Sequence, residues 1–176
     1  MTTWPEHYAC AHGLRLTEGG MSIRPIHWHD RESIRQWRNG QLDVLRQDQP
    51  LTEEQQDTYF RDVILPQFDM EKPPQILLAF LQDGELIGYG GFVHISWSDL
   101  RAEVSFLSNP DRCSRSEWAD DWRVFLGMIA VLARTELGLH RLTTETYAFR
   151  TDVLAYEEAF GFVREGVLRE HHRIDG

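Results

Sequence analysis

The chain has 176 residues, of which 41% are hydrophobic and 26% are charged, and its formal net charge is -10. This length favours one domain, and the hydrophobic fraction is too high for an intrinsically disordered chain. The acidic balance argues against duplex nucleic acid as a partner, and no apolar run approaches the roughly 20 residues that cross a bilayer. Cys10 and Cys113 stand far apart and no secretory signal is readable, so we expect a cytoplasmic protein.

The N-terminal part of the chain has little hydrophobic pattern. We therefore expect an extension or hairpin over residues 1–20, followed by one domain over residues 21–176. The alternation over residues 21–26 predicts either the second half of a hairpin or a loop that leads into a strand.

Two helices are expected next. Asp30 can cap a short helix that stops at Gly40 and carries Ile34 and Trp37 on one face. Thr52, with a glutamine three residues later, has the spacing of a capping box and predicts a helix that ends near residue 65, before prolines break the chain.

The central part of the chain predicts three antiparallel strands, over residues 76–81, 86–95 and 102–107. Asp83-Gly84 between the first two is a strong hairpin signal. Gly88, Gly90 and Gly91 in the second strand indicate a bulge, or a close approach by another backbone or by a ligand.

The C-terminal part of the chain begins with the longest expected helix, from a Ser114–Glu117 capping box to Gly138. A strand, a helix and a last strand are expected over residues 140–148, 151–159 and 162–172. This element order predicts a single α/β domain. Its mixed, mostly antiparallel sheet of six to seven strands is flanked by about four helices.

Five segments between about residue 21 and residue 176 resemble the GCN5-related N-acetyltransferase (GNAT) family. The nearest branch resembles the ribosomal-protein N-terminal alanine acetyltransferases and the amino-sugar and polyamine acetyltransferases. The segments are Ile23-Arg-Pro-Ile26, Trp37-Arg-Asn39, Asp83-Gly-Glu-Leu-Ile-Gly88, Leu137-Gly-Leu-His-Arg-Leu142 and Phe160-Gly-Phe-Val-Arg-Glu-Gly-Val-Leu-Arg-Glu-His171.

The resemblance implies transfer of an acetyl group from acetyl-CoA to a primary amine, with no metal. Glu103 takes the family's usual base position, and Tyr156 is the candidate acid. Two alternatives stand beside these roles: Glu103 can simply pair with an arginine such as Arg101, and Tyr156 can be a packing aromatic, because Glu157 occupies the family's tyrosine slot.

The resemblance also implies a splay between the fourth and fifth family strands, where backbone groups near Phe106 and Leu107 hold the pantetheine arm. The family's glycine-rich pyrophosphate turn corresponds either to residues 112–117 or to residues 117–122, and neither stretch contains a glycine. In the first register the candidate phosphate contacts are Arg112, Cys113, Ser114, Arg115 and Ser116, with Arg150 as a further candidate. The alternative is that this stretch is an exposed loop and a helix cap. The missing glycines leave open a catalytically silent member of the fold that binds a ligand or partner.

In this fold the first two helices shape the acceptor side. The candidate substrate contacts are Trp37, Arg38 and Tyr59, and Arg46 and Phe60 are further candidates. The acceptor is expected to be a small amine, an amino sugar or a protein N-terminus. The family's final strand would come after Gly176. Either the chain is shortened, or the N-terminal segment or another subunit supplies this strand, and because an open sheet edge favours pairing, a homodimer is one expectation.

Overall fold

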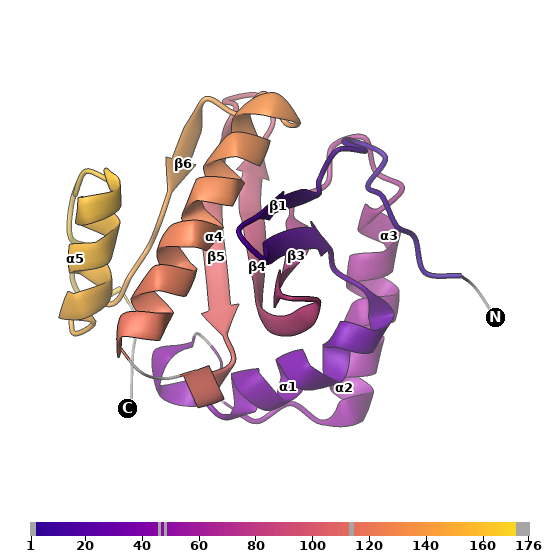
Figure 1. Ribbon diagram of the computed structural model, residues 1–176, viewed down its shortest axis with the longest axis horizontal. Helices are drawn as coiled ribbons and strands as arrows, with labels where there is room; N and C mark the ends of the chain where they lie inside the picture. Colours follow the sequence, from indigo (N-terminus) through magenta and orange to yellow (C-terminus); the bar gives the residue numbers. More distant parts are fainter. Residues whose placement is uncertain (1–2, 46, 48, 113–114, 172–176) are drawn as a thin grey trace. The chain divides into compact units, whose positions relative to one another are not determined.

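The computed structural model describes residues 3–45, 47, 49–112 and 115–171, without the side chains of Arg115 and Ser116 (Figure 1). The chain forms two compact units, Met1–Thr144 and Glu145–Gly176, and each is described by itself.

The first unit is built on a six-stranded sheet with the strands in chain order from β1 to β6. Strands β1 to β5 pair antiparallel and β6 pairs parallel to β5, as expected for a mixed, mostly antiparallel sheet. The strands are β1 (Leu16–Glu18), β2 (Met21–Pro25), β3 (Ile76–Gln82), β4 (Glu85–Ser96), β5 (Arg101–Ser108) and β6 (Arg141–Thr143).

Two hairpin turns are present, the predicted one at Asp83-Gly84 and one between β1 and β2. Gly19 and Gly20, at φ 57° and 84°, join β1 to β2, which decides between the hairpin and the loop expected there. Asp83 and Gly84, at φ 50° and 88°, join β3 to β4. Positive φ at both central residues is the geometry that matches the twist of paired strands.

The glycines of β4 allow close contact between backbones. A Cβ atom at Gly90 would lie 2.0 Å from the Ser105 carbonyl oxygen of β5. Gly91 has φ 134°, and a Cβ atom there would lie 2.2 Å from the Ile76 carbonyl oxygen of β3. The close backbone approach predicted from these glycines is therefore confirmed.

The helices of the first unit are α1 (Arg31–Asn39), α2 (Glu53–Tyr59), α3 (Leu65–Gln67) and α4 (Arg115–Thr135). A π-helix, Phe60–Ile64, joins α2 to α3, and short 3-10 helices cover Trp28–Asp30, Leu42–Val44 and Pro110–Arg112. The second unit contains α5 (Thr151–Phe160).

The starts of α1 and α2 differ in how they are capped. Thr52 and Gln55 form the predicted capping box of α2. Asp30 stands at the start of α1 without capping it, because its carboxylate accepts hydrogen bonds from the His27 N–H and from Arg24 at 2.7 Å. The prediction of an Asp30 cap is thus wrong.

The predicted end of the second helix near residue 65 is passed by two residues. The helix continues through Pro66 to Gln67 because the π-turn before it already departs from the α-helical bonding pattern. A proline that lacks an N–H is tolerated at such a start of a new turn.

The two faces of the sheet carry different helices. Phe106 of β5 stacks against Trp122 and lies 4.6 Å from the Phe125 ring centroid, so α4 covers this face, as Figure 1 also shows. Leu107, the next residue of β5, pairs with Tyr89 of β4, and the Tyr89 hydroxyl contacts Arg38 of α1. Because successive side chains of a strand alternate, α1 lies on the opposite face.

The N-terminal segment contributes to the core of this unit. Tyr8 is fully buried and stacks on Phe68 with 4.1 Å between ring centroids. Its hydroxyl accepts a hydrogen bond from the Leu77 N–H and donates one to the Leu77 carbonyl. Burial raises the pKa of Tyr8, so this hydroxyl stays protonated and keeps both bonds.

The second unit departs from the predicted strands. Helix α5 ends at Gly161, which has φ 118° and donates its N–H to carbonyls of the last turn. Residues 162–171 contain no strand, so the last predicted strand is wrong over its described part. The strand expected over 140–148 is also shorter, since β6 ends at Thr143.

Candidate active site

Strands β5 and β6 pair over a short stretch only. Arg101–Glu103 lie opposite Arg141–Thr143, and the pairing stops there. From Val104 to Ser108, β5 has no strand partner on that side among the residues that the structure describes. This confirms the predicted splay, and it leaves backbone groups that an extended, amide-containing ligand can pair with as an added strand.

Glu103 lies at the apex of this splay, as the last residue of β5 that pairs with β6. Its side chain is 19% exposed. Arg101, the partner that the sequence suggested, instead approaches Asp99 at 3.6 Å. On β4 the residue opposite Glu103 is Val93, in the same register that sets Tyr89 opposite Leu107, so Glu103 faces the α1 side of the sheet.

His94 is the functional candidate that the sequence did not indicate. Its Nδ1 lies 2.9 Å from Oε2 of Glu103. His94 sits at a register shift between Val93 and Ser96 and has φ 50°, which turns its side chain out of the regular alternation of β4. A bulge has no clear sequence signal at a histidine, so only the folded strand pair brings the two side chains together.

The start of α4 favours the first of the two registers considered for the phosphate turn. Because α4 begins at Arg115, residues 117–122 lie inside the helix, where most backbone N–H groups are used by the helix itself. Residues 112–117 span the helix start, where free N–H groups and the helix dipole favour an anion. Cys113 and Ser114 lie outside the described residues, as do the side chains of Arg115 and Ser116.

Arg112 is held by an ion pair with α4. Its Nε and Nη2 donate to the two carboxylate oxygens of Asp121 at 2.8 and 3.1 Å. The Asp121 side chain is only 3% exposed and the Arg112 side chain 23%. The hydrogen bonds to Asp121 raise the pKa of Arg112. The Asp121 carboxylate occupies one edge of the Arg112 guanidinium and compensates its charge, so Arg112 would attract a phosphate less strongly than an unpaired arginine.

The open half of β5 has a buried, unpaired donor beside it. Trp122 of α4 is 5% exposed, and its Nε1 has no hydrogen-bond partner among the residues that the structure describes. Its ring lies 5.0 Å from that of Phe106, centroid to centroid. Because Phe106 stacks in the core and Leu107 is buried, these two predicted contact residues can offer only their backbone groups to a ligand along β5.

The acceptor-side residues on α1 divide into two kinds. Trp37 is 7% exposed and belongs to the core. Arg38 donates from Nε to Gln47 Oε1 at 2.9 Å and from Nη1 to the Tyr89 hydroxyl at 3.0 Å. Its partners are neutral, and in the part of the chain that the structure describes it has no carboxylate partner.

Tyr59 lies near the end of α2 and accepts a hydrogen bond from Gln75 Nε2 at 3.0 Å. Its ring contacts Phe60, which is fully buried in the core. Burial raises the pKa of Tyr59, with smaller electrostatic effects from Tyr89 and Arg38. Arg46, the remaining candidate on this side, lies outside the described residues.

Tyr156 and Arg150 belong to the second unit. Tyr156 is half-buried on α5, and Arg150 precedes the helix without capping it through its side chain. The neighbouring Glu157 is buried and accepts a hydrogen bond from Thr146 Oγ1 at 2.8 Å. The roles of Tyr156 and Arg150 therefore stay predictions.

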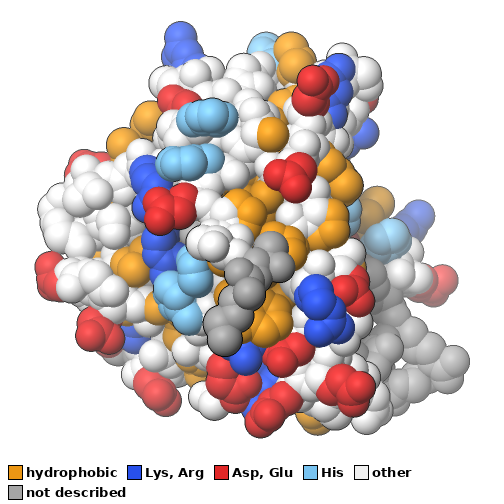
Figure 2. All heavy atoms as spheres, turned by 90° about the vertical axis from the view of Figure 1, so that its right-hand side faces the viewer, with side chains coloured by type: hydrophobic (Ala, Val, Ile, Leu, Met, Phe, Trp, Pro, Cys, Tyr) orange, Lys and Arg blue, Asp and Glu red, His pale blue; other side chains and the backbone are white. Residues whose placement is uncertain are grey.

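Histidine side chains gather on one face of the molecule beside exposed hydrophobic ones (Figure 2). His27 and His29 lie 4.1 Å apart, centroid to centroid, and His27 caps the 3-10 helix that leads into α1. Burial lowers the pKa of His27, and the neighbouring His29 lowers it further. Among the described residues no three His, Cys, Asp or Glu side chains are placed to hold a metal ion.

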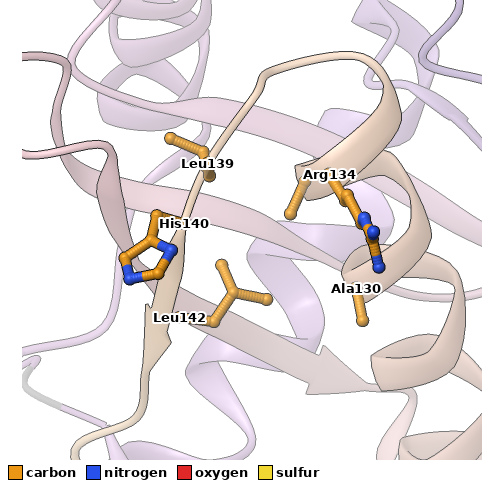
Figure 3. A pocket seen from close by; sticks show the side chains of 6 residues that line it. Ala130, Arg134, Leu139, His140 and Leu142 are labelled. Carbon is orange, nitrogen blue, oxygen red and sulfur yellow. The ribbon is translucent and has the colours of Figure 1, made fainter.

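A separate pocket of about 440 Å³ lies between the C-terminal half of α4 and the start of β6 (Figure 3). Its lining residues are Arg134, His140, Ala130, Ala133, Leu139 and Leu142, with Arg134 on α4 and Leu142 on β6 (Figure 3). None of the residues predicted for the site lines this pocket. No described helix is both long and apolar enough to traverse a bilayer.

Comparison with known proteins gives one family and a set of similar folds. The profile of the acetyltransferase (GNAT) domain matches residues 23–176. No curated protein matches the sequence.

Three similar solved structures come from Vibrio cholerae or derive from it. Spermidine N-acetyltransferase in complex with CoA and spermine has 17% identity and a TM-score of 0.78, with 90% of each chain covered. A chimera of that enzyme with hSSAT has 19% identity and a TM-score of 0.76, covering 90% of this chain and 89% of the other. A dodecameric form has 17% identity and a TM-score of 0.72, covering 90% and 88%.

Proposed function

Because this chain belongs to the acetyltransferase (GNAT) domain family, its reaction is acetyl transfer from acetyl-CoA to a primary amine, and we propose that transfer occurs where β5 and β6 part. The observation that carries this proposal is the end of pairing at Glu103 and Thr143, with a carboxylate at that point. The open half of β5 would bind the amides of the pantetheine arm, and the start of α4 its phosphates.

Glu103 is the residue on which we propose that proton removal from the acceptor depends. An amine is protonated near neutral pH, so it must lose a proton before its nitrogen can attack the thioester carbonyl. A C–N bond then forms, the C–S bond breaks, and the sulfur receives the electron pair and finally a proton. Tyr156 is the proposed donor of that proton, by family resemblance.

The phosphate end of the site departs from the family's glycine turn. Free N–H groups at the start of α4 and the side chains of Ser114, Arg115 and Ser116 are the proposed phosphate contacts, with Arg150 as a further one. Arg112 is proposed to hold the turn through Asp121 rather than to carry the main charge.

The acceptor is proposed to carry hydroxyl or anionic groups, as an amino sugar does, rather than to be a polyamine. Arg38 points its charge at neutral partners on the same sheet face as Glu103. Two like charges at 4 Å repel by about 1 to 4 kcal/mol between water and a protein surface. An arginine whose partners in the described part of the chain are neutral therefore disfavours a polycation. Tyr59, Tyr89 and Gln47 add neutral hydrogen-bonding groups nearby.

The experiment is an acceptor panel. Purified protein is incubated with acetyl-CoA and glucosamine, spermidine or a short peptide; thiol release is measured, and the product is identified by mass spectrometry. We expect acetylation of glucosamine in preference to spermidine. If no amine in the panel gives thiol release, the result favours the catalytically silent fold. Preference for spermidine would refute the acceptor class but keep the transferase.

Arg38→Met tests the acceptor contact directly. We expect the KM for glucosamine to rise by about 10-fold, as for loss of a charged hydrogen bond, while the KM for acetyl-CoA stays unchanged. Arg35→Met is the matched control, because Arg35 is on the same helix but is paired with Glu32 at 2.6 Å. Equal KM changes in both variants would contradict a substrate role for Arg38.

A homodimer is also proposed. β6 is a short edge strand of the described sheet, and an exposed strand edge favours pairing. Light scattering on the purified protein measures its mass, and a monomer over the micromolar range would contradict the proposal.

A further inference from the structure

We propose that the atom that takes the acceptor's proton is Nε2 of His94, and that Glu103 is the residue that orients and charges it. This inference rests on the proposed acetyl transfer and names the proton acceptor within that site. It differs from the expectation of a lone glutamate base, because the structure places an imidazole against the glutamate's carboxylate.

The hydrogen bond between the two side chains sets the tautomer of the imidazole. His94 Nδ1 lies 2.9 Å from Glu103 Oε2. An ionised carboxylate only accepts hydrogen bonds, so Nδ1 must carry the hydrogen. In a neutral imidazole the other ring nitrogen then has a free lone pair, which makes Nε2 the atom that can accept a proton.

Exposure divides the roles between the two groups. The His94 side chain is 67% exposed, whereas that of Glu103 is 19% exposed. The ring can therefore meet an acceptor that arrives from solvent, while the carboxylate lies behind it against the sheet. In this arrangement a negative charge stabilises the imidazolium that forms, which is the role of the carboxylate in other histidine–carboxylate pairs.

The backbone at His94 supports a functional position. His94 has φ 50°, in the left-handed region that residues other than glycine seldom occupy. Such outliers persist where the surrounding structure holds them, and they cluster at active sites. Here the outlier coincides with the register shift of β4 that turns the ring toward Glu103.

The His94–Glu103 pair lies at the point in the sheet where acetyl transfer is proposed to occur. Glu103 is the last rung between β5 and β6, so the imidazole lies where the open half of β5 begins. The other charged groups close to this apex are Arg101 and Asp99, which approach each other at 3.6 Å, and Arg141, in register with Arg101. The pair is therefore the group at this apex that combines a proton acceptor with a counter-charge.

The proton balance closes without any further reagent. The acceptor's ammonium gives one proton to Nε2, and its nitrogen then attacks the thioester carbonyl. As the C–N bond forms and the C–S bond breaks, the nitrogen loses a second proton and the sulfur gains one, which yields the amide and free thiol. The imidazolium then releases its proton to solvent.

The first test reads the tautomer without any substrate. Long-range proton–nitrogen NMR on the full chain at neutral pH should show His94 with a protonated Nδ1 and an unprotonated Nε2, with His94→Gln used for assignment. Glu103→Ala should shift the population toward the Nε2–H form. Finding the Nε2–H form in the unmodified protein would overturn the proposal even if acetyl transfer is confirmed.

The second test separates the two residues by rate, with acetyl-CoA and glucosamine. We expect His94→Ala to lower kcat by about 100- to 10,000-fold, as for loss of a general base, with the KM for acetyl-CoA unchanged. Added imidazole should restore part of this loss. Glu103→Gln should lower kcat less, because its amide oxygen can still accept the Nδ1 hydrogen.

The control is His140→Ala, an exposed histidine at the separate pocket, which should leave kcat unchanged. Full activity of His94→Ala together with a large loss in Glu103→Gln would make the carboxylate itself the base. If the unmodified protein shows no thiol release with any amine, the acetyl-transfer assignment fails instead, and the NMR test still decides the tautomer.

Discussion

Two pairs of a carboxylate and a basic side chain lie near opposite ends of β5, and they differ in how far their side chains are exposed to solvent. At Glu103 the basic partner is His94, which is 67% exposed. Beyond Ser108 the carboxylate is Asp121, 3% exposed, and its partner Arg112 is 23% exposed. Exposure and chemistry together thus distinguish the pair proposed to exchange a proton from the pair proposed to hold the turn before α4.

The largest effect is expected from removing both members of the exposed pair. If His94 and Glu103 act as one unit, His94→Ala with Glu103→Gln should lose no more kcat than His94→Ala alone, about 100- to 10,000-fold. Steady-state rates of the two single variants and the double variant measure this. Losses that multiply would show two independent roles and would break the comparison.

The next effect concerns the buried pair. Arg112→Ala leaves the Asp121 carboxylate buried without its partner, so the free energy of unfolding should fall by about 3 to 5 kcal/mol. Urea denaturation measures the change.

The double variant Arg112→Met with Asp121→Leu serves as the control. It removes the buried charge and should recover most of the lost stability, since a packed apolar pair often replaces a buried ion pair without loss. A stable Arg112→Ala protein that binds acetyl-CoA poorly would instead make Arg112 a phosphate ligand.

A purely structural reference is available at Tyr8. Tyr8→Phe removes the hydroxyl that pairs with both backbone groups of Leu77, so stability should fall by about 1 to 3 kcal/mol while kcat stays unchanged. Denaturation and rate measurements on the same preparation test both parts. A large rate loss here would mean that rate losses elsewhere also report general instability.

The smallest effect is expected at Trp122. Its Nε1 is a buried donor that has no partner in the described part of the chain and lies beside the open half of β5, so Trp122→Phe should cost little stability. If that donor meets an acceptor on acetyl-CoA, the Kd should rise by about 3- to 10-fold, as for one hydrogen bond. Calorimetric titration measures it, and an unchanged Kd would place Trp122 with the structural residues.

Much of the fold was readable from local patterns. The turn at Asp83-Gly84, the Thr52 capping box and the long helix appear where the sequence predicts them, because each depends on neighbours a few residues away. The expected strand over residues 162–172 was wrong in its described part, because an alternating apolar pattern specifies a strand only if a partner edge is present.

For the site, the sequence by itself determined the position of Glu103 on its strand and the lack of glycines before α4. The open stretch that follows Glu103 was expected only from the family resemblance. Only the tertiary structure set His94 against Glu103 and Asp121 against Arg112. The physical reason is that a bulge and a helix start decide which distant side chains meet. Those meetings depend on the register between elements, which no short stretch of sequence encodes.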